Sequence, residues 1–218
     1  MGPDWERDRQ DLVVRLEKWG YITSPAVRNA FLKVPRGRFV PEDVRRSAYE
    51  DVPLPIGHGQ TISAPSMIVI MLEEAALKPG EGVLEIGTGS GYNAALLAEI
   101  AGPDCVVSVE RWPELAEAGR ANLAAAGYNV EVVVGDGTKG HPPQAPYDCI
   151  IATAGAPKVP RSWRDQTKVG GRIVAPIGRS RFSQILVTAR RVSESTWDDK
   201  EGTPCAFVPL IGSEGWRE

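Results

Sequence analysis

The stretch Val83-Leu84-Glu85-Ile86-Gly87-Thr88-Gly89-Ser90-Gly91 decides the fold of this chain. Its apolar start predicts a buried strand that ends in a carboxylate, its glycines predict a tight G-x-G-x-G turn, and residues 92–101 predict a helix. Glycines let a backbone approach a ligand closely, and a helix N-terminus offers unpaired N–H groups. The stretch therefore predicts a cradle for an adenosine-containing cofactor.

Strand and helix patterns alternate from residue 65 onward. Strands are predicted at 82–86, 105–110, 130–134, 147–152, 172–177, 184–191 and 205–210. Helices are predicted at 65–77, 92–101, 113–126 and 159–167. Such alternation is typical of an α/β fold with a mostly parallel, doubly wound, Rossmann-like sheet.

The first 60 residues have a different pattern. Leu12, Val13 and Leu16 recur at helical spacing, and Ser24-Pro25 predicts the start of a second helix. Residues 52–59 are rich in proline and glycine and are predicted to form a loop, not a strand. We expect one domain over residues 1–218, in which 1–60 form a helical extension and substrate-side loop and 61–218 form the cofactor-binding core.

Composition excludes several classes of protein. The 218 residues carry a net charge of −3, so there is no basic field to attract nucleic acid. The longest apolar runs have the length of strands, and the N-terminus lacks an apolar segment, so neither a membrane partner nor a signal peptide is expected. Three unpaired-looking cysteines suit a cytoplasmic protein, and two histidines without ligand spacing predict no metal site.

Glu85 distinguishes between the candidate cofactors. Dinucleotide enzymes use G-x-G-x-x-G, and a carboxylate two residues before the first glycine would repel their pyrophosphate. S-adenosyl-L-methionine instead carries an ammonium and a sulfonium, which a carboxylate favours. The spacing and the charge of Glu85 together predict S-adenosyl-L-methionine as the cofactor.

Two further carboxylates lie at or just after the ends of predicted strands. Glu110 ends the second strand about 20 residues after the glycines, where a ribose diol would bind. Asp136, between Gly135 and Gly137, ends the third strand, where an adenine amino group could be recognised. Because ligands bind at the carboxyl ends of parallel strands, Glu85, Glu110 and Asp136 are expected to share one edge of the sheet.

Several segments resemble the protein-L-isoaspartate (D-aspartate) O-methyltransferase family. They are Pro55-Ile56-Gly57-His58-Gly59-Gln60-Thr61-Ile62-Ser63-Ala64-Pro65, Leu84 to Ala94, Gly135-Asp136-Gly137, Ala145-Pro146-Tyr147-Asp148 and Gly170-Gly171-Arg172. The resemblance implies a class I methyltransferase that methylates the α-carboxylate of L-isoaspartyl residues in damaged proteins, with S-adenosyl-L-homocysteine as product. The ester then closes to a succinimide, which can reopen as aspartate; tolerance of D-aspartyl residues stays open.

The resemblance also assigns Ser63 the active-site role, and we expect its hydroxyl to orient the substrate carboxylate. The expected substrate-binding residues are His58, Gln60, Thr61 and Ser63. The expected cofactor-binding residues are Thr61, Ile62, Glu85, Gly87, Thr88, Gly89, Ser90, Gly91, Glu110, Arg111, Gly135, Asp136 and Gly137. No raised-pKa base is needed, because the nucleophile is already a carboxylate.

Alternatives remain open from the residues alone. Ser63 precedes Pro65 and an apolar helix, so it could serve as a helix N-cap instead of, or in addition to, a catalytic group. The chain could be a class I methyltransferase of a small molecule or tRNA, a non-enzymatic cofactor-binding protein, or an NAD-dependent dehydrogenase. The expected partners are damaged proteins or peptides containing isoaspartyl residues. The chain itself is expected to be a monomer.

Overall fold

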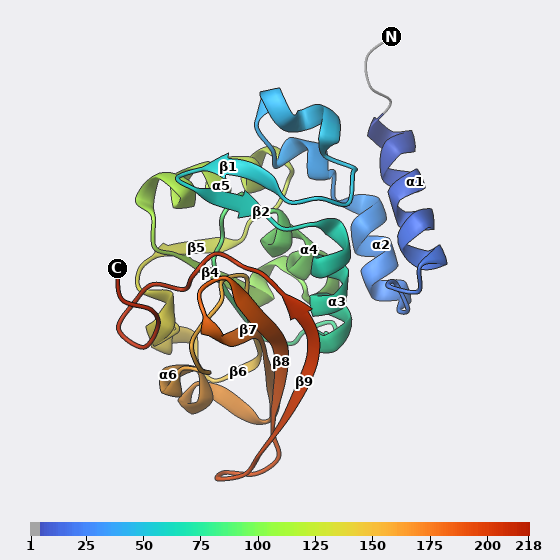
Figure 1. The fold of residues 1–218 in the computed structure, drawn as a ribbon. Coiled ribbons are helices and arrows are strands. Elements are labelled where there is room, and N and C mark those ends of the chain that lie inside the picture. The colour runs from blue at the N-terminus through green and yellow to red at the C-terminus, as the bar shows by residue number, and fades with distance from the viewer. Residues whose placement is uncertain (1–4) are drawn as a thin grey trace.

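A seven-stranded sheet forms the centre of the molecule. The computed structural model describes residues 5–218, and its sheet has the order β5-β4-β3-β6-β7-β8-β9 (Figure 1). The strands are β3 (Val83–Ile86), β4 (Val106–Glu110), β5 (Glu131–Val134), β6 (Tyr147–Ala152), β7 (Thr167–Ser180), β8 (Ser183–Arg191) and β9 (Trp197–Cys205).

The sheet is mostly parallel, as predicted. Strands β3 to β7 pair with one another in parallel, whereas β8 and β9 are antiparallel to their neighbours. The carboxyl ends of β3, β4, β5 and β6 therefore meet at one edge of the sheet, where the chain turns into the segments that carry the predicted site.

Helices cover both faces of the sheet, because successive residues of each buried strand point to opposite sides. Val83 packs into a cluster with the helices of the first half of the chain, whereas Leu84 and Ile86 pack into a second cluster that contains Trp163 of α6. The helices are α3 (Pro65–Ala75), α4 (Tyr92–Ala101), α5 (Pro113–Ala125) and α6 (Arg161–Asp165).

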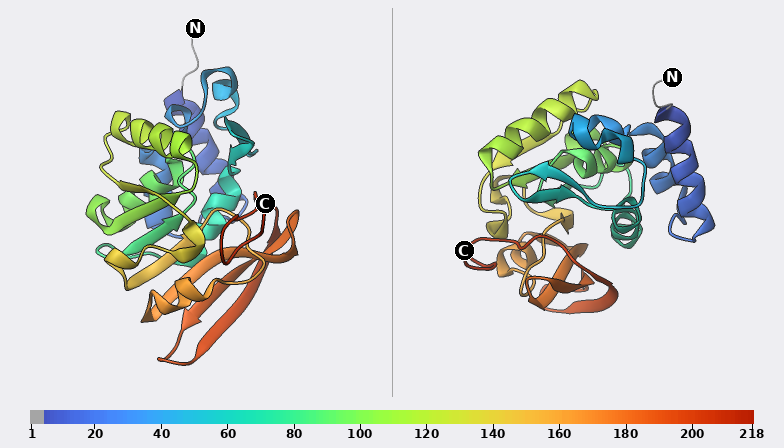
Figure 2. Two further views of the ribbon diagram at one scale, coloured as in Figure 1. Left: turned by 90° about the vertical axis from the view of Figure 1, so that its left-hand side faces the viewer. Right: turned by 45° about the horizontal axis from the view of Figure 1, so that its top comes forward.

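The N-terminal extension is helical, as predicted. Helix α1 (Trp5–Lys18) and helix α2 (Pro25–Lys33) lie outside α3 and α4, far from β7–β9 (Figures 1 and 2). Ser24 caps α2, accepting a hydrogen bond from the N–H of Val27 at 3.3 Å. Short 3-10 turns follow at Arg36–Arg38 and Glu42–Ser47. Buried residues of α1 and α2 share one cluster with those of α3 and α4.

The prediction of a loop at residues 52–59 was wrong. The chain forms a two-stranded antiparallel hairpin there, β1 (Leu54–Gly57) with β2 (Gln60–Ile62). Its turn is His58-Gly59, both with positive φ, which suits a tight hairpin turn. Proline and glycine at this place therefore shape a hairpin rather than preventing one.

The prediction of a strand at residues 205–210 was also wrong. The last strand is β9 (Trp197–Cys205), a mostly exposed edge strand, and the chain then crosses the sheet as an irregular segment. Gly155 N–H donates to Val208 O and Leu210 N–H donates to Gly155 O, both at 2.8 Å. These bonds form one isolated parallel bridge, between Gly155 and Pro209, so Phe207 and Leu210 are buried beside the end of β6 without a continuous strand.

Smaller differences concern element ends. The predicted helix 159–167 is shorter, at Arg161–Asp165, while β7 begins earlier and ends later than the predicted 172–177. Over residues 5–218, no helix is both long and apolar enough to cross a bilayer.

Candidate active site

The glycine turn after β3 is shaped by close contacts that exclude larger side chains. A Cβ on Gly87 would lie 2.5 Å from Thr153 Oγ1, and one on Gly91 would lie 2.9 Å from both Gly119 O and Leu123 Cγ. Both glycines have positive φ, at 96° and 86°. The turn can therefore pass tightly between β6 and α5 only with glycine at these positions.

Glu110 joins the turn to the end of β4. Its Oε2 accepts a hydrogen bond from the Gly89 N–H at 3.0 Å, and its Oε1 accepts one from the Trp112 N–H at 3.1 Å. Glu110 also lines the cleft at the carboxyl edge of the parallel strands, which is described below as the main cleft. A carboxylate at this place can accept further hydrogen bonds, and its binding to a ribose diol stays a prediction.

Glu85 lies elsewhere than expected. It is completely buried, and its carboxylate accepts hydrogen bonds from Asn93 Nδ2 at 2.8 Å and from Ser108 Oγ at 2.5 Å. Thr88 Oγ1 bonds Ser108 Oγ in turn, at 2.6 Å. Burial raises the pKa of Glu85 to about 7, against the two hydrogen bonds that lower it. Direct contact between Glu85 and a cationic ligand stays a prediction, because the structure does not bring this carboxylate to the wall of the cleft.

The main cleft opens at the carboxyl edge of the parallel strands. Its cavity volume is about 180 Å³. Its walls come from the β1–β2 hairpin, from the ends of β3, β4 and β6, and from the segment after β9. The lining residues are Ile56, Gln60, Thr61, Ile86, Gly87, Gly89, Val109, Glu110, Arg111, Trp112, Gly137, Thr153, Ala154, Val208, Pro209, Leu210 and Ile211.

The C-terminal segment extends this cleft into a second cavity. Gly135, Asp136 and Arg111 face residues Ile211, Gly212, Trp216, Arg217 and Glu218 across it. Asp136 accepts hydrogen bonds from Thr138 N–H and Oγ1 and from Ser213 N–H, and these bonds hold its pKa below the usual value despite partial burial. Arg111 pairs with Glu218 at 2.5 Å. The predicted adenine-end residues are therefore brought together, and the tail closes their outer side.

A smaller pocket lies where the hairpin meets the glycine turn. Its lining is Thr61, Ile62, Ser63, Ile68, Gly87, Thr88, Gly89, Ser90, Asn93 and Thr153. The structure thus brings Ile62, Thr88 and Ser90, predicted to bind the cofactor, together with Ser63. Gly91 lies behind the turn, against α5, and contributes by its conformation.

Ser63 also lines a further pocket, with Pro53, Thr61, Ala64, Met67, Thr153, Ala206, Phe207 and Val208. It is not the N-cap of α3: that position is Ala64, and it has no side-chain capping bond. The first turn of α3 instead bonds Asp51, whose Oδ1 accepts from the Ser66 N–H at 2.8 Å. The capping alternative for Ser63 is therefore wrong, and its hydroxyl is not used by the helix.

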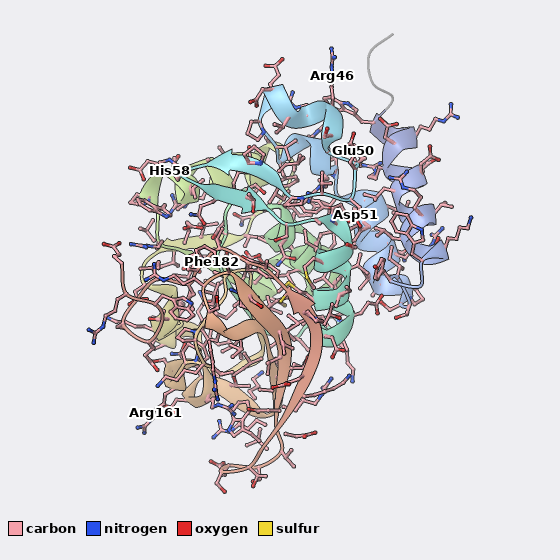
Figure 3. The ribbon with its side chains drawn as sticks, in the orientation of Figure 1. Arg46, Glu50, Asp51, His58, Arg161 and Phe182 are labelled. Carbon is pink, nitrogen blue, oxygen red and sulfur yellow. The ribbon has the colours of Figure 1, made fainter. Side chains whose placement is uncertain are left out.

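Of the two predicted substrate-binding residues Gln60 and His58, only Gln60 lines the main cleft. Gln60 lines the main cleft, and its Nε2 donates to His58 O at 3.1 Å. His58 lies at the tip of the β1–β2 hairpin (Figure 3), with its ring 5.6 Å from that of Trp112. It lines none of the pockets described above, so its role in substrate binding stays a prediction.

Sequence reasoning missed two parts of the site. Thr153 follows β6 as Gly87 follows β3, and its Oγ1 donates to Gly87 O at 2.8 Å while it lines three pockets. Its signal was its place after a buried strand. Residues 206–211 line the cleft as an irregular segment, although their apolar composition is typical of a strand.

The fold and the site define a class I, Rossmann-like methyltransferase. That class has a parallel sheet with a G-x-G-x-G turn, a carboxylate at the end of the neighbouring strand and a cleft at the carboxyl edge, as this chain has. A solved protein-L-isoaspartate O-methyltransferase has the same fold, with a TM-score of 0.85 at 34% identity over 95% of this chain and 67% of the other. A putative member from Plasmodium falciparum, solved with S-adenosyl-L-homocysteine, matches at 24% identity and a TM-score of 0.82, over 93% of this chain and 98% of the other.

Sequence comparison shows the family. The model of protein-L-isoaspartate(D-aspartate) O-methyltransferase matches residues 7–215. The protein-L-isoaspartate O-methyltransferase of Methanopyrus kandleri is 54% identical over 98% of this chain and 96% of its own length, and that of Hyperthermus butylicus is 51% identical over 99% and 93%. The chain belongs to the protein-L-isoaspartate O-methyltransferase family.

Proposed function

We propose that this chain transfers a methyl group from S-adenosyl-L-methionine to the α-carboxylate of L-isoaspartyl residues in damaged proteins. The observation that carries the proposal is a shared wall between two pockets. Thr61 and Thr153 line both the main cleft and the pocket that contains Ser63. A cofactor in the first and a peptide carboxylate in the second would therefore meet at this wall.

The residues present fit the cofactor. Gly87 and Gly89 line the cleft without side chains, so a ligand can approach their backbone, and Glu110 offers a carboxylate for a diol. When bound, S-adenosyl-L-methionine supplies an electrophilic methyl group on a positively charged sulfur. We assign Thr88, Ser90 and the glycine turn to its amino acid end and Glu110 to its ribose.

The reaction needs positioning more than acid–base chemistry. Methyl transfer to a carboxylate is an in-line displacement that neutralises a positive and a negative charge, so removing water from the pair favours it. The apolar lining near the shared wall, including Ile56, Ile86 and Val208, supports that removal. Ser63 would donate a hydrogen bond that orients the carboxylate, while the side chains of residues 206–208 would border the peptide.

The partners follow from this chemistry. We propose that client proteins present the damaged residue on an extended segment, since the pocket opens at the surface, and that a single copy of the chain acts. The three free cysteines support a reducing, cytoplasmic location.

A competition among acceptors tests the proposal. The protein is mixed with labelled S-adenosyl-L-methionine and, in separate arms, an isoaspartyl peptide, unfractionated tRNA and a small-molecule extract. Label in the peptide, lost as methanol when the ester closes, is the expected result. Label in tRNA or in small molecules alone would favour another class I methyltransferase, and cofactor binding without transfer would favour a non-enzymatic role.

A further inference from the structure

A buried arginine outside the predicted site is bonded to the Ser63 backbone. Arg36 lies in the 3-10 turn Arg36–Arg38 of the N-terminal extension and is 0% exposed. Its Nη2 donates to the Ser63 carbonyl at 2.8 Å, and its Nε donates to the Ala48 carbonyl at 2.9 Å. The guanidinium carbon also lies 5.1 Å from the ring centre of Tyr92, the first residue of α4. Arg36 thus contacts the N-terminal extension, helix α4 and the segment of residues 60–64 around Ser63, which we call the substrate segment.

This arginine is poorly explained as a stabilising ion pair. Among residues 5–218 its guanidinium has no carboxylate within ion-pair distance, and its Nη1 is buried without a hydrogen-bond partner. Asp51 lies near enough only to act through its field. Burying an unpaired charge costs several kcal/mol, on the order of the stability of a small domain. A role in the site accounts for its presence better than a role in stability.

Arg36 bonds the part of the substrate segment that belongs to neither a strand nor a helix. Residues 60–62 are held by pairing with β1, and α3 begins at Pro65, so Ser63 and Ala64 lie between two regular elements. Arg36 fixes the first of these by its carbonyl. Asp51, labelled in Figure 3 near the first turn of α3, fixes the far side through the Ser66 N–H. Two tertiary contacts therefore bracket the residue that faces the peptide pocket.

We propose that Arg36 is a positioning residue for methyl transfer: its guanidinium holds the Ser63 carbonyl, and thereby aims the Ser63 hydroxyl at the substrate carboxylate. The inference rests on the proposed function. Because the cofactor side of the cleft is held separately, by the β1–β2 pairing and by Glu110, loss of Arg36 should affect the peptide and spare the cofactor.

The test compares three variants with the wild-type chain. Arg36→Lys keeps a positive charge but cannot bond two carbonyls with a planar fork. Asp51→Ala releases the other side of the segment and is the second variant should Arg36→Lys fail to fold. Arg172→Lys is the matched control, because Arg172 is also buried and bonds backbone carbonyls, at Ala75 and Ala76, remote from the cleft.

For Arg36→Lys and Asp51→Ala, the expected result is a rise of about tenfold in KM for an isoaspartyl peptide, with a smaller fall in kcat, since the hydroxyl would bind ground and transition states alike. The dissociation constant of S-adenosyl-L-methionine should stay within about twofold of wild type. Arg172→Lys should lower the melting temperature without changing KM.

Three results would overturn the inference: an unchanged peptide KM in a folded Arg36→Lys chain, a parallel loss of cofactor binding, or an equal KM rise in Arg172→Lys. A wild-type chain that methylates no isoaspartyl peptide would instead refute the proposed function, so the two failures are distinguishable.

Discussion

Glu110 accepts a hydrogen bond from the Gly89 N–H at 3.0 Å, so a carboxylate at the end of β4 is bonded to the middle glycine of the turn after β3. The same carboxylate accepts from the Trp112 N–H. One side chain therefore fixes the turn and offers its remaining lone pairs to the cleft.

Glu110→Gln should weaken cofactor binding. The amide leaves one acceptor oxygen for two backbone donors and removes the charge, so we expect binding at least tenfold weaker, in the range of about 1.5–3 kcal/mol for hydrogen bonds to charged groups. Calorimetric titration with S-adenosyl-L-homocysteine measures it. Glu117→Gln, at an exposed position on α5, is the control and should bind as wild type. Equal affinity in both variants would contradict the ribose-side role.

Ser63→Ala should lower kcat/KM for an isoaspartyl peptide by about 10- to 100-fold, mainly through a higher KM, because the carboxylate loses the hydrogen bond that holds it in place. Cofactor affinity should not change, and neither should the melting temperature, since Ser63 does not cap α3. Ser195→Ala, on the exposed turn before β9, is the matched control. Wild-type turnover by Ser63→Ala would refute the orienting role.

Asp136→Ala should release the C-terminal tail. Asp136 bonds Thr138 and Ser213 at once, and loss of both should weaken cofactor binding and expose residues after Ile211 to limited proteolysis. Asp165→Ala, an exposed surface change, should leave the tail protected. Glu214, which accepts from Arg161 N–H, and Trp216, whose Nε1 donates to Gly155 O, also hold the tail. A tail equally protected in Asp136→Ala would show that these two contacts suffice.

Stability should fall as pH rises from about 4.5 to about 7. The folded pKa of Glu85 is raised by burial from 4.5 to about 7, so the folded chain binds this proton more tightly than the unfolded chain, and ionisation within that window destabilises the fold. The shift corresponds to a few kcal/mol at most, at roughly 1.4 kcal/mol per pKa unit. The lowered pKa values of Glu81, Asp136 and Asp148 act in the opposite sense, at lower pH.

Glu85→Gln isolates that effect. The amide can still accept from Ser108, so the fold should persist while the fall in denaturant midpoint between pH 4.5 and pH 7 flattens. Glu131→Gln, on the exposed side of β5, should keep the wild-type slope. An identical slope in Glu85→Gln would mean that the folded pKa of Glu85 is not raised above its unfolded value.

The buried parallel strands could be predicted closely from sequence, because short, continuous apolar runs such as 147–152 are typical of strands covered on both faces. Strand β9 could not be predicted, because it is an exposed edge strand and its sequence does not alternate between apolar and polar residues. The segment 206–210 is apolar and is therefore predicted to be a strand. It is buried because it bonds Gly155 after β6, a long-range contact that no local sequence pattern reveals.

The site shows the same limit. Glu110, Asp136 and the glycines could be placed by their position after strands, which sets their edge of the sheet. Glu85 lies inside its strand, and its side chain points into the α4 side of the core, where it meets Asn93 and Ser108. Arg36 carries no such signal, because its partner is a backbone carbonyl 27 residues away, a contact that exists only after folding.

The central claim is that this cleft methylates isoaspartyl and not aspartyl residues. The most direct measurement is kcat/KM for two peptides of one sequence, one with L-isoaspartate and the other with L-aspartate at the same position, with labelled S-adenosyl-L-methionine. We predict transfer to the isoaspartyl peptide at least about 100-fold above its twin, on the order of 3 kcal/mol of discrimination. Equal transfer to both peptides, or to neither, would contradict the account.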